Sequence, residues 1–355
     1  MQTPYITIDT CKIEQNTRTI VDQCKKYGIQ VAGVTKGTLG MVEVAQAMIR
    51  GGIDWIGESR LDNIERLRRS NIDTPILLMR SPHMSEIERV VSLADVSLNS
   101  EYEIIKALSD KSLSKGFVHK IIIMVDLGDL REGVWPNELL PLVKEVVSMK
   151  GIEIIGLGTN LTDLNGTIPT YENNKQLVDL AKEIEEKCKI KLQYLSAGNS
   201  SSLKLLASGK IPERINHFRI GEGILLGRET INRETWGNTL QDAFTLYAEI
   251  IEKKLKPSLP IGEIGQDAFG NIPQLEDRGM MTRAILNVGR QDTNVDGLTP
   301  KQSNIEILGA TSDHLIIDLT QEAAMNVGDT VAFDLNYAAL LSAMTSPFVN
   351  KVVQR

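Results

Sequence analysis

Short apolar runs rich in β-branched residues alternate with longer amphipathic segments between residue 29 and about residue 220. This alternation predicts repeated strand and helix units and a parallel sheet. The segment at 59–69, for example, carries apolar residues at a repeated spacing of three, as on one face of a helix. Eight runs are predicted to be strands, beginning near residues 31, 53, 75, 95, 121, 152, 192 and 217.

Eight strands with intervening helices favour a closed (β/α)8 barrel, the TIM barrel, over an open doubly wound sheet. Periodicity does not show closure, so the open sheet stays as the alternative. Beyond about residue 231, strand-like runs are separated by turn-rich stretches such as 265–273 and 292–300. A length of 355 residues suits two domains. We therefore expect an α/β chain with a barrel domain at 1–230 and a mainly-β domain at 231–355.

Composition excludes several classes of protein. Hydrophobic residues are 42% and charged residues 24%, which is ordinary globular usage. A net charge of -7 argues against a partner that is a nucleic acid. The three cysteines are scattered, which fits neither a disulfide framework nor a metal motif. The first residues lack the pattern of a signal peptide and no apolar run is long enough to span a membrane, so we expect a soluble, cytoplasmic protein.

Lys36 is the first candidate for chemistry. It follows the first predicted barrel strand and precedes Gly37, so its amine is expected at the carboxyl-terminal mouth, where barrel enzymes place their active sites. A lone lysine is more often a solvated surface residue, so the context must decide. Other distinctive residues also follow predicted strands: the DLGDLREG segment at 126–133, Asn160, the AGNSSS run at 197–202 and Arg219. These loops are expected to converge on one face.

Two of these segments suit a phosphate group. The small residues of AGNSSS and of RIGEG at 219–223 expose backbone N–H groups and hydroxyls, and barrel phosphate sites commonly follow strands seven and eight. Each alone is equally well explained as a turn or a helix cap. Their joint placement favours phosphate. The GLGTN segment at 156–160 lacks the third glycine of a dinucleotide fingerprint and is set aside.

Together these motifs resemble the alanine racemase family of fold-type III pyridoxal-phosphate (PLP) enzymes, and most closely its branch that acts on ornithine. The matching motifs cover nearly the whole chain in the family's order: VTKG at 34–37, DLGDLREG, GNSS at 198–201, RIG at 219–221, PIGE at 260–263 and VGDTV at 327–331. The resemblance implies that Lys36 binds PLP as a Schiff base and that Arg219 contacts the pyridine nitrogen. It assigns further cofactor contacts to Arg131, Asn199, Ser200, Gly221, Glu222 and Tyr337. The alternative for Tyr337 is an ordinary aromatic of the β domain.

The chain departs from the family where a partner subunit's tyrosine serves as the second acid/base. The corresponding stretch at 289–292 reads Gly-Arg-Gln-Asp. Asp292, Asp313 and His314 are the candidates to replace that tyrosine, and each is alternatively a solvated turn residue or cap. Arg290 cannot readily act as a base, but its guanidinium is suited to bind the substrate carboxylate.

The resemblance implies a racemase that interconverts L- and D-ornithine, a small-molecule amino acid substrate, as a homodimer. Two alternatives stay open. One is a PLP-dependent D-amino acid lyase or aldolase on the same fold. Those enzymes are expected to bind a divalent metal, and because the sequence has no paired histidine and cysteine cluster near its end, we expect no metal. The other is a non-catalytic PLP-binding homeostasis protein, which would have no use for about 120 residues after the barrel.

Overall fold

The computed structural model describes residues 2–355 and divides the chain into two compact units. One unit is Thr10–Gln241, and the other combines Met1–Asp9 with Asp242–Arg355. The sequence placed the boundary at 230/231 and assigned the amino-terminal residues to the barrel. The division differs at the amino terminus because strand β1 (Tyr5–Asp9) pairs with β10 (Phe244–Pro257) and β16 (Asn350–Gln354).

The first unit is a closed barrel of eight parallel strands, which confirms the predicted fold class. Each predicted apolar run corresponds to one barrel strand. In chain order the strands are β2 Gln30–Val34, β3 Trp55–Glu58, β4 Ile76–Leu78, β5 Val96–Asn99, β6 His119–Met124, β7 Ile152–Gly158, β8 Tyr194–Gly198 and β9 His217–Ile220. The barrel closes where β9 pairs with β2.

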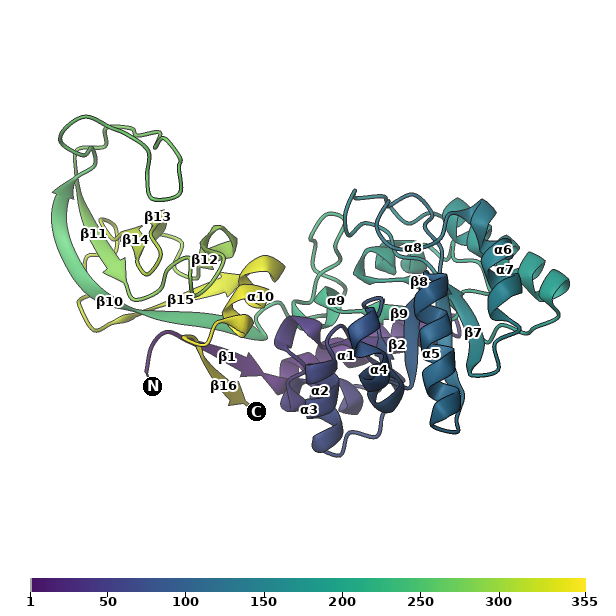
Figure 1. Cartoon of the computed structure of the whole chain (residues 1–355). Coiled ribbons are helices and arrows are strands. Elements are labelled where there is room, and N and C mark those ends of the chain that lie inside the picture. The colour runs from purple at the N-terminus through teal and green to yellow at the C-terminus, as the bar shows by residue number, and fades with distance from the viewer. Residues whose placement is uncertain (1) are drawn as a thin grey trace. The chain divides into compact units, whose positions relative to one another are not determined.

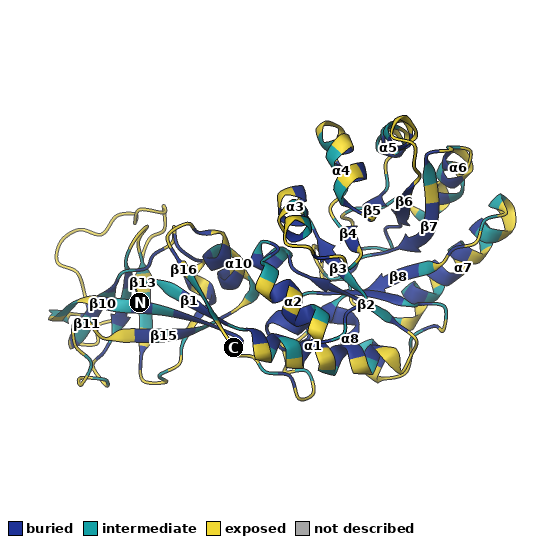
Figure 2. Cartoon of the chain, turned by 90° about the horizontal axis from the view of Figure 1, so that it is seen from below, coloured by how far each residue is buried: buried dark blue, intermediate teal, exposed yellow. Residues whose placement is uncertain are grey.

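Helices surround the barrel strands (Figure 1). They are α1 Thr10–Lys25, α2 Val42–Arg50, α3 Leu61–Arg69, α4 Ile87–Leu93, α5 Tyr102–Ser114, α6 Pro136–Val146, α7 Tyr171–Cys188, α8 Leu203–Ala207 and α9 Glu222–Leu225. Local sequence fixes some boundaries: α7 begins at a capping box in which Thr170 and Asn173 satisfy each other's backbone N–H groups. Figure 2 shows the amphipathic result, with buried barrel strands and exposed outer faces on the helices.

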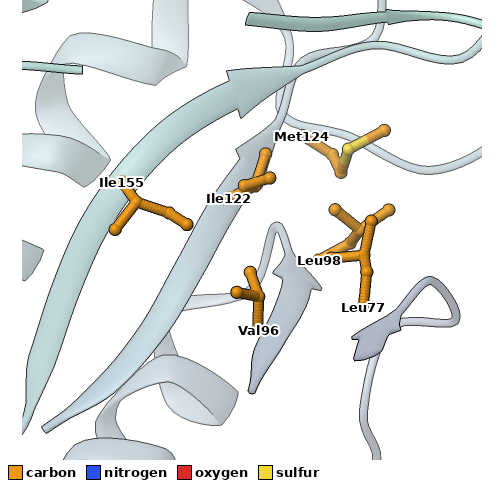
Figure 3. Packing of buried hydrophobic residues seen from close by; sticks show 6 residues of the cluster. All are labelled: Leu77, Val96, Leu98, Ile122, Met124 and Ile155. Carbon is orange, nitrogen blue, oxygen red and sulfur yellow. The ribbon is translucent and has the colours of Figure 1, made fainter. Parts of the chain in front are cut away.

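Apolar side chains from four neighbouring strands form a cluster in the core of the barrel unit (Figure 3). Residues at alternate positions of a strand lie on the same face, and β5 and β6 each contribute such a pair. The alternate residues of β6, Ile121 and Ile123, are also buried, as expected when a parallel sheet is covered on both faces. The cluster consists of Leu77, Val96, Leu98, Ile122, Met124 and Ile155.

The second unit is an eight-stranded sheet that is antiparallel except for the pairing of β1 with β16. Its central path runs β12-β15-β10-β11-β14-β13. The remaining bounds are β11 Met280–Leu286, β12 Leu298–Pro300, β13 Glu306–Ala310, β14 Leu315–Asp318, β15 Thr330–Leu335 and helix α10 Tyr337–Thr345. The expected mainly-β character of the carboxyl-terminal part is confirmed. Of the helices within residues 2–355, none has the length and hydropathy needed to cross a membrane.

Gly198 shows how the barrel constrains the loops at its mouth. A Cβ atom at this position would lie 2.1 Å from Cδ1 of Phe218, so only glycine fits between β8 and β9 here. The chain then turns directly into the short 3-10 helix Ser200–Ser202. The loops after β2, β6, β7, β8 and β9 leave the same end of the barrel, because all its strands are parallel.

Candidate functional site at the carboxyl-terminal mouth of the barrel

Lys36 lies where the sequence analysis expected it, directly after β2. It is half-buried and is the first residue of the 3-10 helix Lys36–Thr38. Strand β2 pairs with β3 on one side and with β9 on the other, and Ala32 of β2 is in register with Arg219 of β9. Lys36 and Arg219 are therefore presented from adjacent strands at the same end of the barrel.

The turn that carries Lys36 is held by a residue that sequence reasoning missed. Glu58 ends β3 and is fully buried. Its carboxylate accepts a hydrogen bond of 2.9 Å from the Thr35 hydroxyl, one of 2.6 Å from the backbone N–H of Ser59 and one of 3.2 Å from the Asn63 amide. Burial raises the pKa of Glu58, and these donors oppose that shift. The only sequence signal was a glutamate at the end of an apolar run.

Arg219 carries a buried charge in the barrel. The residue is only 5% exposed, and burial lowers the pKa of its guanidinium to about 10, which still leaves it charged at neutral pH. Its NH1 donates to the Ser196 hydroxyl and, at 2.9 Å, to the Ser196 carbonyl. Its NH2 donates to the Thr159 carbonyl at 2.7 Å. A guanidinium fixed in this way is suited to donate a hydrogen bond to a ligand from a rigid position.

Arg131 belongs to a charged cluster on the loops after β6 and β7. Its guanidinium pairs with Glu132, and its NH1 donates to Asp163 at 2.8 Å. The Asn160 amide donates to the same Asp163 oxygen at 2.8 Å. The carboxylates of Glu132 and Asp163 also favour the charged form of Arg219. Arg131 was a candidate, whereas the two acidic partners were not identified from the sequence.

Asp129 joins these two loops. Its side chain is 1% exposed, and it accepts hydrogen bonds from the backbone N–H groups of Leu164 at 2.9 Å, Asn165 at 3.2 Å and Thr167 at 3.3 Å. Desolvation by burial raises the pKa of Asp129, but the backbone donors outweigh it and the net pKa is lowered. The carboxylate therefore fastens the loop after β7, with Asn160 and Asp163, to the loop after β6.

The candidate phosphate loop follows β8. The Asn199 side chain accepts from the backbone N–H of Ser201 at 2.8 Å and donates to the Leu161 carbonyl at 2.9 Å. The buried Ser200 hydroxyl accepts from the backbone N–H of Gly223 at 3.0 Å. Within residues 2–355 that hydroxyl donates to no partner, so its hydrogen remains available to an anion.

Gly221 and Glu222 begin the short helix after β9. Glu222 is buried, and one of its carboxylate oxygens accepts from Arg233. The other oxygen, Oε1, has no hydrogen-bond partner among the described residues. This turn and Ser200 follow the neighbouring strands β9 and β8, and the hydrogen bond between Ser200 and Gly223 joins them.

The remaining candidates lie in the second unit. The backbone of Arg290 donates to the Thr311 carbonyl at 3.0 Å, which brings the turn of Asp292 against the turn of Asp313 and His314. Asp292 is 5% exposed and accepts from the backbone N–H of Gly289 at 2.8 Å. Burial raises the pKa of Asp292, and the charge of Asp313 adds to the effect.

Arg290, His314 and Tyr337 are less enclosed. Arg290 pairs with Asp296 at 3.1 Å, and its guanidinium lies 5.1 Å from the centroid of the Phe269 ring. His314 lies 3.5 Å from the Asp313 carboxylate and is substantially exposed. Tyr337 is half-buried at the first turn of α10. The structure describes no group of three or more His, Cys, Asp or Glu within residues 2–355 that could hold a metal ion.

The fold and the site define a two-unit protein with a closed eight-stranded parallel barrel that carries a lysine at its carboxyl-terminal mouth. Comparison with known proteins identifies its family. The family model described as alanine racemase, N-terminal domain, matches residues 8–228. An ornithine racemase from Acetoanaerobium sticklandii is 42% identical over 98% of this chain and 99% of its own length. A lysine racemase from Thermotoga maritima is 40% identical over 99% of this chain and 98% of its own.

A solved structure agrees with this assignment at the level of the fold. The alanine racemase of Bartonella henselae, crystallised with covalently bound pyridoxal phosphate, superimposes with a TM-score of 0.76 at 17% identity, over 100% of both chains. The chain belongs to the alanine racemase family.

We predict that Asp129→Asn destabilises the barrel unit, because an amide can no longer accept from three backbone donors without turning its own N–H groups toward them. The loss at neutral pH should be about 1–3 kcal/mol. The pKa of Asp129 is lowered from 3.8, so its contribution is complete above about pH 4 and disappears as the pH falls through the folded-state value. Urea unfolding of both proteins at pH 7 and at progressively lower pH measures the difference.

Asp110→Asn is the control, because Asp110 is an exposed aspartate paired with Lys106. This substitution should lower the free energy of unfolding by less than about 1 kcal/mol. A cost for Asp129→Asn that equals the control, or that grows as the pH falls, would contradict the role assigned to Asp129.

Proposed function

We propose that this protein is a PLP-dependent amino acid racemase that interconverts L- and D-ornithine. One observation carries the proposal: Lys36 lies just beyond the end of β2, and the buried Arg219 lies near the end of the adjacent strand β9 of the same closed barrel. The similarity to an ornithine racemase over nearly the whole of both chains supports the same reaction. That similarity includes the β domain, which favours a racemase over a single-domain PLP-binding protein.

The residues at the barrel mouth fit PLP. The donor set matches its chemistry, because the fixed guanidinium of Arg219 offers a donor to a ring nitrogen and the Ser200 hydroxyl keeps a hydrogen for a phosphate oxygen. Lys36 is the amine that would hold the aldehyde. We assign further contacts of the cofactor to Arg131, Asn199, Tyr337 and the backbone at Gly221 and Glu222.

Bound PLP supplies an electron-accepting ring that stabilises the negative charge left on an α-carbon when its proton is removed. The chain's own residues must then remove a proton from one face and return one to the other. We assign the first face to Lys36. Because Arg219 remains a cation at neutral pH, it disfavours a second positive charge on the ring nitrogen beside it.

Asp292 and His314 are our candidates for the second face. Burial raises the pKa of Asp292, which is the direction that suits a carboxyl group that must carry a proton nearer to neutral pH. We assign Arg290 to the substrate carboxylate, since guanidinium and carboxylate form paired hydrogen bonds.

The side-chain amine of the substrate distinguishes the candidate amino acids. The two curated relatives are named for ornithine and lysine, which both carry a terminal ammonium group. We favour ornithine on the higher identity. A site that pairs this ammonium group would leave its acceptors unsatisfied with alanine.

Incubation with PLP followed by borohydride reduction should attach the cofactor to the peptide that contains Lys36. Lys36→Ala should abolish both the adduct and racemisation, because no other amine holds this position, and peptide mass spectrometry measures the result. Lys106→Ala serves as the control, since Lys106 is an exposed lysine paired with Asp110. An adduct on a different lysine would remove Lys36 from the reaction.

With L-ornithine as substrate, chiral chromatography should show conversion to an equal mixture of both enantiomers. In heavy water both should carry deuterium at the α-carbon, because the proton is exchanged during inversion. We expect ornithine to react at least about tenfold faster than alanine, the discrimination typical of a lost polar contact. Equal rates for alanine, faster turnover of lysine, or loss of the side chain or carboxylate would each overturn this assignment.

We further propose that the protein is a cytoplasmic homodimer in which the partner subunit's Asp292 or His314 reaches the barrel mouth. Light scattering should give twice the chain mass of 39.3 kDa. Mixing inactive Lys36→Ala and Asp292→Asn chains under subunit exchange should restore activity, because mixed dimers contain one intact site. An active monomer would refute the arrangement, and Asp292→Asn with full activity would leave His314 as the candidate to be tested in the same way.

A further inference from the structure

Ser196, which accepts hydrogen bonds from Arg219, also contacts a buried histidine, His217, that has no role in the candidate site. His217 begins β9, two residues before Arg219, and Ser196 lies in the adjacent strand β8. The Nδ1 atom of His217 lies 2.7 Å from the Ser196 hydroxyl, which also accepts from Arg219. The exposed fractions are 1% for His217, 0% for Ser196 and 5% for Arg219. The three side chains form one buried chain of hydrogen bonds.

The chemistry of the donors fixes where the hydrogens lie. A guanidinium only donates, so the Ser196 oxygen is an acceptor toward Arg219. Among the described residues the Ser196 hydroxyl has one other partner, His217 Nδ1, so the hydroxyl hydrogen is satisfied only when it is donated to that nitrogen. Nδ1 is then an acceptor, and the ring carries its hydrogen on Nε2. Burial, with the charge of Arg219 as a second cause, lowers the pKa of His217 to about 3, so the ring is neutral at physiological pH.

The far side of the ring agrees with this assignment. Within residues 2–355, Nε2 of His217 has no hydrogen-bond partner. The rings of Trp55 and Tyr194 lie near the imidazole in T-shaped arrangements, with centroid separations of 5.6 Å and 5.8 Å and interplanar angles of 74° and 69°. An N–H group meets aromatic rings at a lower cost than an unpaired lone pair would. With 1% of its surface exposed, the imidazole is shielded from solvent.

We propose that His217 and Ser196 are positioning residues that orient the guanidinium of Arg219 toward the barrel mouth. The neutral imidazole accepts the hydrogen of the Ser196 hydroxyl and so sets the direction in which that hydrogen points. The hydroxyl oxygen then offers a lone pair to NH1 of Arg219. NH2 is held separately by the Thr159 carbonyl. The inference rests on the proposed function only in naming PLP as the ligand that Arg219 meets.

The barrel contains a matched pair that lacks the arginine. His119 begins β6, and its Nε2 lies 2.9 Å from the hydroxyl of Ser97 in β5. That hydroxyl accepts at 2.9 Å from the amide of Asn99 in place of a guanidinium. Burial lowers the pKa of His119 to about 4, so it is neutral as well. Substitutions of His119 or Ser97 therefore remove a buried hydrogen bond between histidine and serine that does not involve Arg219.

The first test needs no cofactor. The chain has four histidines, so the imidazole nitrogen-15 signals of His217 can be assigned by their loss in His217→Phe. We expect a neutral ring with its hydrogen on Nε2 that does not titrate between pH 5 and pH 8, the range in which an unperturbed histidine changes charge. A hydrogen on Nδ1, or titration near the ordinary histidine value, would overturn the proposal.

The second test compares the two pairs in the PLP-loaded protein. His217→Phe and Ser196→Ala should each shift the visible absorbance maximum of bound PLP and weaken its binding by about tenfold, the effect of losing one hydrogen bond to a charged group. His119→Phe and Ser97→Ala should leave the absorbance maximum in place and change the affinity for PLP by less than about twofold. Ser196→Thr, which keeps the hydroxyl, should restore the native absorbance.

The outcomes separate this inference from the proposed function. If PLP binds the native protein but all four variants behave alike, or Ser196→Ala has no effect, the positioning role is refuted and the racemase assignment stands. If the native protein binds no PLP, the proposed function fails, while the tautomer measurement still decides the hydrogen-bond chain. Should His217→Phe fail to fold, the comparison of Ser196→Ala with Ser196→Thr and Ser97→Ala decides the question.

Discussion

The burial of one cation in the barrel constrains much of the candidate site. A guanidinium taken out of water must have its N–H groups satisfied, or the free energy of folding rises by several kcal/mol. Arg219 meets this requirement for NH1 and NH2 with the carbonyl and hydroxyl of Ser196 and the carbonyl of Thr159. Arg219 lies in β9, and its acceptors lie in β8 and directly after β7. Its hydrogen bonds therefore connect three consecutive strands of the barrel.

The neighbouring loops are organised by buried carboxylates in a similar way. Glu58 holds the turn of Lys36, and Asp129 fastens the loop after β7 to the loop after β6. Each accepts backbone N–H groups that would otherwise be unsatisfied in a buried loop. The loops of the candidate site are thus held by the chain's own hydrogen bonds, and such internal support favours a preorganised site.

The repeating part of the fold could be predicted from the sequence because each barrel strand is a local apolar run. Strand β1 was missed because its partners, β10 and β16, lie more than two hundred residues away, and local periodicity carries no information about such pairing. Lys36, Ser200 and Arg219 were proposed as site residues from their position at the ends of predicted strands and from family motifs. Glu58, Asp129 and His217 were not found, because their roles depend on which groups face them in the folded chain.

The central claim is that an enclosed, charged Arg219 faces the ring nitrogen of PLP and keeps that nitrogen unprotonated. Nitrogen-15 NMR of the protein loaded with PLP labelled at the ring nitrogen tests it directly. The account predicts the chemical shift of an unprotonated nitrogen accepting a hydrogen bond throughout neutral pH, and a change toward the protonated shift in Arg219→Glu, where a carboxylate favours the pyridinium. A protonated ring nitrogen in the native protein would contradict the account.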